Sequence, residues 1–203
     1  MSTLKWGDAS AQRKVLFVEG DDEFRAIAAL MQDQSISGLG LRDLHGRTNL
    51  GEKLSVARKA SGFSEVQSVG ILCDAEQSFA VSWSNVTGAL EVAGLSVPAA
   101  PLSRARGTPD VTVFISPDNS GNGVFEDIFL DCMAGDPHMG CVEPFASCIT
   151  GMVSMNAAHE SKLKMQALVA SKGKRLIGEA ADNHVFDWSH IAFRPLIEFL
   201  RTL

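Results

Sequence analysis

The chain has 203 residues, of which 45% are apolar and 21% are charged, which is enough to bury a core within one domain. Its net charge of −6 argues against non-specific nucleic-acid binding by the whole protein, although Arg104, Arg106 and the segment 162–175 supply local basic surface. There is no apolar run of about 18 residues, no signal-peptide pattern and no CxxC pair, so we expect a cytoplasmic protein with reduced thiols, away from membranes.

The predicted elements alternate between strands and helices over most of the chain. Residues 1–12 are polar and weakly patterned, and we expect a frayed lead-in there. Strands are predicted at 14–19, 36–44, 69–74 and 111–115, and helices at 21–31, 50–62, 78–93, 124–133, 142–153, 158–171 and 189–202. This order predicts an α/β domain over 1–135, with a mainly parallel four-stranded sheet flanked by helices. Residues 136–203 are expected to form a helical C-terminal extension packed on the same core.

Carboxylates follow two of the predicted strands directly. Glu19 comes after the first strand and Asp74 after the third, and the carboxyl ends of parallel strands meet at one edge of a sheet. Glu76 shares the face of Asp74 if that strand continues, and Glu23 lies one turn above Glu19 if the helix begins at once. Crowded carboxylates cost free energy unless a cation, a proton or a basic side chain compensates them. We expect a divalent metal ion, and oxygen ligands suit Mg²⁺ or Mn²⁺.

Other acidic residues have simpler explanations that compete with a role in such a site. Asp118 lies in a Ser-Pro-Asp-Asn-Ser-Gly stretch and is expected to serve a turn. Glu126 and Asp127 open a helix, where the helix dipole favours acids, and this explanation and a site role are equally open. Asp21 and Asp22 are interpreted only as first-turn residues of the first helix.

Two motifs, in order and each at a strand end, resemble those of the Toprim domain over roughly residues 14–133. Within that superfamily the chain is similar to stand-alone OLD-type Toprim proteins of largely unknown function. The segments that carry the resemblance are Val18–Phe24 and Ile71–Glu76, followed by Gly123–Asp127, His159–Lys164 and Ile177–Ala181.

The resemblance implies a metal site on carboxylates, a lysine that assists the transition state and phosphodiester chemistry on nucleic acid. The residues in these roles would be Glu19, Asp74 and Glu76 for one metal, Glu23, Asp118 and Glu126 for a second, and Glu19 with Lys162 or Lys164 in catalysis. Glu76 stands where Asp is commoner in the family. No Walker A pattern is present, so an OLD-like ATPase partner would be a separate protein.

Two functions from different classes follow as expectations. The first is a Mg²⁺- or Mn²⁺-dependent nuclease that hydrolyses phosphodiesters of DNA or RNA. The alternative is a catalytically inert Toprim module that binds a partner protein or nucleic acid in a defence or repair assembly. The chain has no tyrosine, so the tyrosine-dependent transesterification of topoisomerases is excluded. The oligomeric state stays open.

Overall fold

The computed structural model describes residues 13–46 and 48–203, so the predicted lead-in and Arg47 lie outside the described residues. The strands are β1 (Lys14–Val18), β2 (Leu39–Asp43), β3 (Ser68–Asp74) and β4 (Asp110–Ser116). The helices are α1 (Asp21–Asp33), α2 (Leu50–Lys59), α3 (Phe79–Ala93), α4 (Phe125–Cys132), α5 (Met139–Thr150), α6 (Ala157–Ser171), α7 (Ile177–Asp182) and α8 (Arg194–Thr202), with short 3-10 helices η2 (Phe63–Glu65) and η3 (Ile191–Phe193).

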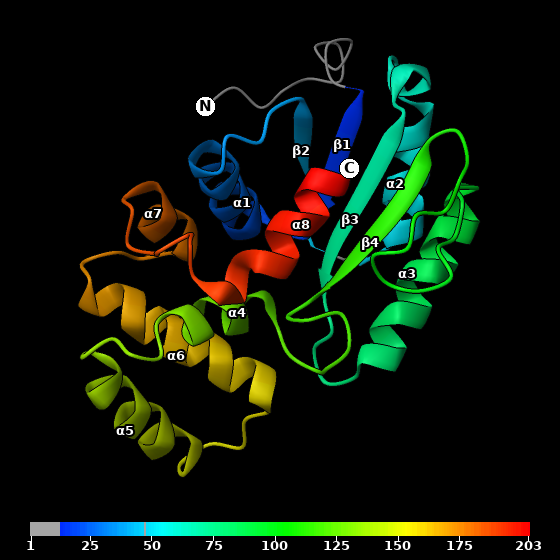
Figure 1. Cartoon of the computed structure of the whole chain (residues 1–203). Coiled ribbons are helices and arrows are strands. Elements are labelled where there is room, and N and C mark those ends of the chain that lie inside the picture. Colours follow the sequence, from blue (N-terminus) through cyan, green and yellow to red (C-terminus); the bar gives the residue numbers. More distant parts are fainter. Residues whose placement is uncertain (1–12, 47) are drawn as a thin grey trace.

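The four strands form one sheet in the order β2-β1-β3-β4, and each neighbouring pair is parallel (Figure 1). The predicted fold class, an α/β protein with a parallel four-stranded sheet and helical C-terminal part, is therefore confirmed. Phe17 pairs with Ile71 and Val18 with Asp43, so β1, β2 and β3 end at the same edge. Whatever follows these three strands is brought to one side of the molecule.

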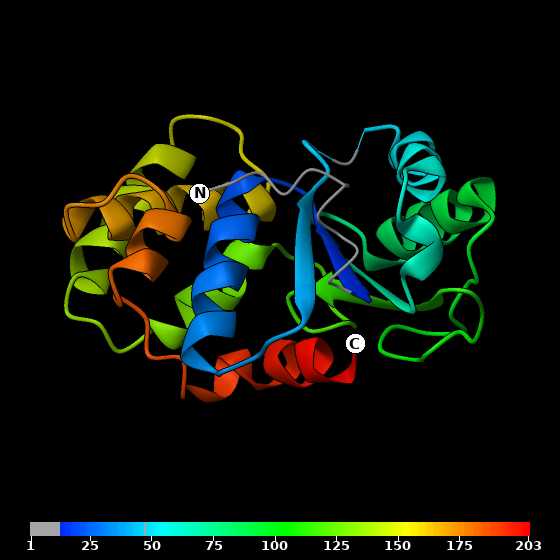
Figure 2. The ribbon, with the colours of Figure 1, turned by 90° about the horizontal axis from the view of Figure 1, so that it is seen from above.

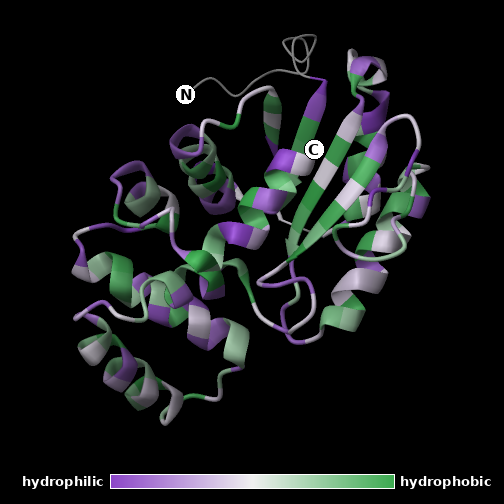
Figure 3. Ribbon diagram, viewed as in Figure 1, coloured by the Kyte–Doolittle hydropathy of each residue, from purple (hydrophilic) through white to green (hydrophobic). Residues whose placement is uncertain are grey.

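Helices cover both faces of the sheet (Figure 2), and the strands are hydrophobic over much of their length (Figure 3). In β1, Leu16 and Val18 face a core shared with α1, α4 and the C-terminal helices, whereas Val15 and Phe17 face α2 and α3. Because successive side chains of a strand alternate between faces, a strand buried on both sides needs an unbroken apolar run. This is the pattern that the sequence has at residues 15–18.

The C-terminal helices complete the core on the α1 face. The ring centroids of Phe114 in β4 and Phe199 in α8 lie 5.4 Å apart. A side chain at Gly70 in β3 would place its Cβ only 2.5 Å from Leu203, so the glycine lets the end of α8 lie close to the sheet. The division into residues 1–135 and 136–203 stays a prediction. None of the described helices has the length and apolar character needed to cross a membrane.

Most helix boundaries lie within two residues of the expected ones, but the helix expected over 50–62 ends at Lys59 and the one expected over 189–202 begins at Arg194. The helix expected over 142–153 begins at Met139 and ends at Thr150. Helix α7 was not predicted, because its six residues are too few for a helical period to show. It lies against α1, far away in sequence, and contacts of that kind leave no local pattern.

Asp136, after α4, is expected to stabilise the C-terminal helices at neutral pH. A hydrogen bond from Lys172 and others from His138 lower the pKa of Asp136 from 3.8 to about 2. With a folded-state pKa below the unfolded value, this stabilisation is complete above about pH 4 and is lost as the pH falls through 2. Asp136→Asn should therefore lower the free energy of unfolding by about 1 kcal/mol at pH 7, allowing for solvent screening.

Urea unfolding of the wild type and of Asp136→Asn at pH 7 and pH 2 measures this difference directly. The two proteins should converge in stability at the lower pH. A difference that is the same at both pH values would show that the carboxylate charge of Asp136 does not contribute.

Candidate metal centre

Glu19 and Asp74, which lie 55 positions apart in the chain, meet at the carboxyl edge of the sheet. The backbone N–H of Asp74 donates to Glu19 Oε1 at 3.2 Å. Asp74 Oδ1 in turn accepts a hydrogen bond of 2.8 Å from the N–H of Phe125, the first residue of α4. The positive end of α4 therefore faces a carboxylate, which is a favourable arrangement. The end of β1, the end of β3 and the start of α4 thus converge on one place.

Burial and the proximity of other carboxylates disfavour ionisation of the acids in this place. Asp74 is only 3% exposed, and burial together with the carboxylates of Glu19 and Glu126 raises its pKa well above the usual value. Burial also raises the pKa of Glu126 to about 7, with a further contribution from Glu23. The pKa of Glu23 is raised as well, mainly by burial. We name Glu19, Glu23, Asp74 and Glu126 the acidic cluster.

Lys162, on α6, supplies positive charge to this cluster. Its Nζ lies 3.8 Å from Asp74 Oδ2 and 3.6 Å from Glu76 Oε1. Burial alone would lower the pKa of Lys162, but Asp74, Glu126 and Glu76 together raise it above the usual value. Both distances are too long for good hydrogen bonds, so Lys162 acts on the acids through its charge.

Glu23 is directed into the cluster by the turn that joins β1 to α1. Its side chain folds back over Gly20, where an added Cβ would lie 3.0 Å from Glu23 Oε2. Gly20 has an extended backbone (φ −153°), which any residue can adopt, and its missing side chain leaves room for the Glu23 carboxylate.

Glu76 lies near Lys162, but not because the strand continues past Asp74, as the sequence suggested. The strand ends at Asp74, and Glu76 has a positive φ of 55°, so the two acids are not alternate residues of one strand. Instead, the backbones of Glu76 and Gly123 exchange hydrogen bonds of 2.7 and 2.9 Å. This bridge holds the turn after β3 against the segment that begins α4.

Asp118 and Asp127 accept hydrogen bonds from backbone N–H groups close to them in the sequence. Asp118 is exposed and its Oδ1 accepts from the backbone of Ser120 and Gly121, as expected for a turn residue. Partial burial alone would raise the pKa of Asp118, but these hydrogen bonds hold it below the usual value. Asp127 Oδ2 accepts from Val124 N–H at 2.7 Å and so caps α4.

The two candidate lysines differ clearly in their surroundings. Lys164 Nζ lies 2.9 Å from both Glu143 and Glu160, which tie it to α5 and to its own helix. Lys162, half a turn earlier on α6, is the one that contacts the acids of β3 and the following turn. A catalytic role for either lysine, and a metal-binding role for Asp118, stay predictions.

Two acids near the cluster were not assigned to it by the sequence. Asp43 ends β2, pairs with His45 at 2.9 Å and contributes to the raised pKa of Glu23. It is the last residue of its strand, as Asp74 is of β3, so the same rule could have found it. Asp22, beside Glu23 on α1, was interpreted as a first-turn residue, but its carboxylate binds the backbone of α7. Nothing local in the sequence indicates that contact.

The oxygen atoms of the acidic cluster are of the kind that a hard divalent cation prefers, but in the described residues they are not arranged to hold one. In residues 13–46 and 48–203, no three His, Cys, Asp or Glu side chains are placed to hold a metal ion together. The possible metal ligands of the cluster are nevertheless all oxygen atoms. Among the described residues, the buried Oε2 of Glu126 has no hydrogen-bond partner.

A parallel four-stranded sheet with a Glu-Gly turn after β1 and an acidic turn after β3 defines an α/β protein with acids at the carboxyl edge of its sheet. The chain belongs to the family described as protein of unknown function DUF3226, whose model matches residues 13–203. The search of curated proteins gives no significant match.

Solved structures similar to the chain include three of the C-terminal region of the OLD protein of Xanthomonas campestris pv. campestris, phased with mercury, iodine and platinum. Sequence identity is 17%, 16% and 16%, and the TM-scores are 0.48, 0.49 and 0.48, respectively. The matches cover 94% of this chain and 95%, 95% and 93% of the others. At this identity the likeness is one of fold alone.

Proposed function

We propose that the protein is a Mg²⁺- or Mn²⁺-dependent phosphodiester hydrolase that acts on nucleic acid at the acidic cluster. The observation that carries the proposal is the meeting of Glu19 and Asp74 with Glu126 in a buried setting that raises the pKa of Asp74. A folded protein that gathers carboxylates in this way is destabilised by their repulsion unless a cation or proton compensates it. Clusters of this kind are typical of functional sites.

In this proposal Glu19, Asp74 and Glu126 hold the cation, with Glu23 and Glu76 as further donors. The bound cation would polarise the phosphodiester and lower the pKa of coordinated water. Lys162 would offset the negative charge that develops on the phosphate oxygens, since its ammonium already faces Asp74. Lys164 and Asp118 are not needed for this arrangement, because their recorded contacts are made elsewhere.

The partner implied by this chemistry is nucleic acid, DNA or RNA, reached from the carboxyl edge of the sheet. A separate ATPase or other protein partner is proposed as well, and its only support is the resemblance to OLD-type proteins. The four cysteines are all free, which agrees with a reducing, cytoplasmic location.

Replacing Glu19 by glutamine tests the proposal with little risk to the fold, because the amide oxygen can still accept the Asp74 N–H. Manganese at about 100 times its Kd should stabilise the wild type by about 2.7 kcal/mol, and Glu19→Gln should lose most of this gain. Glu19→Gln should also lose the nicking of supercoiled plasmid that we expect of the wild type. Thermal unfolding with and without manganese, and a plasmid assay, measure the two effects.

Glu198→Gln on α8 is the matched control, because Glu198 is exposed and its ion pair with Arg194 spans 3.9 Å. This variant should keep both manganese stabilisation and nicking. A wild type whose stability does not respond to manganese or magnesium would overturn the proposal.

A second candidate function is an inert Toprim module that binds a partner protein or nucleic acid. The observation that favours it is that Lys162 already lies within 4 Å of two of the carboxylates and compensates part of their charge without a metal. Wild-type protein that gains stability from manganese but cleaves neither DNA nor RNA would select this alternative.

A further inference from the structure

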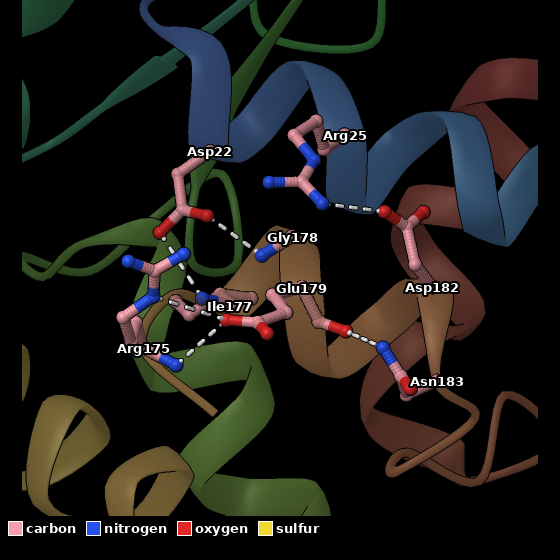
Figure 4. A network of polar contacts seen from close by, with 8 residues as sticks. All are labelled: Asp22, Arg25, Arg175, Ile177, Gly178, Glu179, Asp182 and Asn183. Carbon is pink, nitrogen blue, oxygen red and sulfur yellow. Dashed lines mark hydrogen bonds and ion pairs between the residues drawn. The ribbon is translucent and has the colours of Figure 1, made fainter. Parts of the chain in front are cut away.

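The contact between α1 and α7 joins the first helix of the sheet domain to the C-terminal helices (Figure 4). Asp22 Oδ1 accepts from the N–H of Gly178 at 2.6 Å, and Oδ2 accepts from Ile177 at 3.2 Å. These are the first two residues of α7, whose own N-cap residue, Leu176, offers no side-chain oxygen. Asp22 therefore caps α7 from 155 positions away in the sequence.

Two further features fix the distance between α1 and α7. A Cβ at Gly178 would lie 2.5 Å from Cβ of Arg25, so a side chain at this position would push the helices apart. One helical turn along, Arg25 Nη2 lies 2.7 Å from Asp182 Oδ2. The interface is thus held at both ends of α7, and at position 178, near its first end, it is too close for any residue but glycine.

This interface borders the acidic cluster. A small cavity of about 30 Å³ is lined by residues that include Asp22 of α1, Glu126 of α4, Lys162 of α6 and Ile177 of α7. The segment 172–176 is all that separates α6 from α7 in the chain. A displacement of α7 from α1 would therefore reach α6 both through this packing and through the short connection.

We propose that Asp22 is a positioning residue, which holds α7 on α1 and thereby keeps the ammonium of Lys162 opposite Asp74 and Glu76. The inference rests on the proposed function in one respect, the role of Lys162 in cleavage. Its structural part, the placement of Lys162 by Asp22, does not depend on that role. Because the distances from Lys162 to Asp74 and Glu76 are 3.8 and 3.6 Å, small shifts of α6 would change this charge pairing appreciably.

The position of Lys162 can be read without any activity, from its labelling by an amine-acetylating reagent followed by mass spectrometry. In Asp22→Ala the labelling rate of Lys162 should rise about threefold, since its side chain is 35% exposed and would become freely accessible. Asp22→Asn should lie between this variant and the wild type, because its amide oxygen can still accept one N–H. Gly178→Ala should behave like Asp22→Ala without any change of charge.

Asp21→Ala is the matched control, because Asp21 lies in the same turn and carries the same charge but is exposed. It should leave both labelling and nicking at the wild-type level. Unchanged Lys162 labelling in folded Asp22→Ala and Gly178→Ala would overturn the inference, whether or not the wild type cleaves nucleic acid.

A double-mutant cycle separates positioning from a general structural role. Asp22→Ala should lower the nicking rate about 10- to 100-fold in the wild type, and should have no further effect in Lys162→Ala. Manganese stabilisation should persist, because Glu19 and Asp74 are held by the sheet. An equal loss in both backgrounds would overturn the inference. A wild type without nicking would refute the proposed function and leave the labelling test to decide this one.

Discussion

Replacing Asp74 by asparagine is expected to abolish cation-dependent stabilisation and yet leave the metal-free protein at least as stable as the wild type. The amide oxygen can still accept the N–H of Phe125, so the start of α4 keeps its partner. The change removes an acid whose ionisation is disfavoured by its burial and by the neighbouring carboxylates of Glu19 and Glu126. We expect a gain of about 1 kcal/mol without metal and a loss of about 2–3 kcal/mol of the manganese effect.

Asp110→Asn is the matched control for this experiment. Asp110 is a buried aspartate at the start of the neighbouring strand β4, at the opposite end of the sheet. The N–H of Gly107 and the side chains of Arg104 and Arg106 hydrogen-bond its carboxylate and lower its pKa.

The control should therefore be less stable than the wild type without metal and should respond normally to manganese. Unfolding of both variants in EDTA and in manganese gives the comparison. If Asp74→Asn were destabilised in EDTA and still gained stability from manganese, Asp74 would be a structural acid like Asp110.

Replacing Lys162 by alanine is expected to separate cation binding from cleavage. The metal-free protein should lose about 1–2 kcal/mol, because Asp74 and Glu76 lose their positive neighbour in a partly buried setting. Manganese should bind at least about threefold more tightly, since a competing positive charge is gone. The nicking rate should nevertheless fall about 10²- to 10³-fold.

Lys164→Ala is the corresponding control on the same helix. Lys164 pairs with Glu143 and Glu160, and its loss should cost less than about 1 kcal/mol and leave manganese affinity and nicking unchanged. Calorimetric titration with manganese and the plasmid assay provide the measurements. A larger loss of nicking in Lys164→Ala than in Lys162→Ala would show that the wrong lysine has been assigned.

Local sequence patterns were sufficient to predict the fold. The apolar run at residues 15–18 indicated a strand buried on both faces, and the alternation of strands and helices indicated a parallel sheet. The pattern could not reveal α7, whose position depends on Asp22 and Gly178 meeting across the fold. Such contacts are set by tertiary packing, which single-sequence patterns do not encode.

The candidate site was predictable where it depends on topology. Glu19 and Asp74 follow adjacent parallel strands, so their meeting follows from the sheet alone. The choice between Lys162 and Lys164 was not predictable. Their side chains point to nearly opposite sides of the helix, and only the packing of the helix decides which side faces the acids. Glu76 contacts Lys162 through a turn with positive φ, and not through the strand alternation that suggested its role.

The most direct test of the account is to locate manganese in crystals of the protein by anomalous diffraction. We expect an ion whose ligands include carboxylate oxygens of both Glu19 and Asp74, and we expect no ion there in Asp74→Asn crystals grown in the same way. Manganese bound only at other acids of the surface, with Glu19 and Asp74 free of it at saturating concentration, would contradict the central claim.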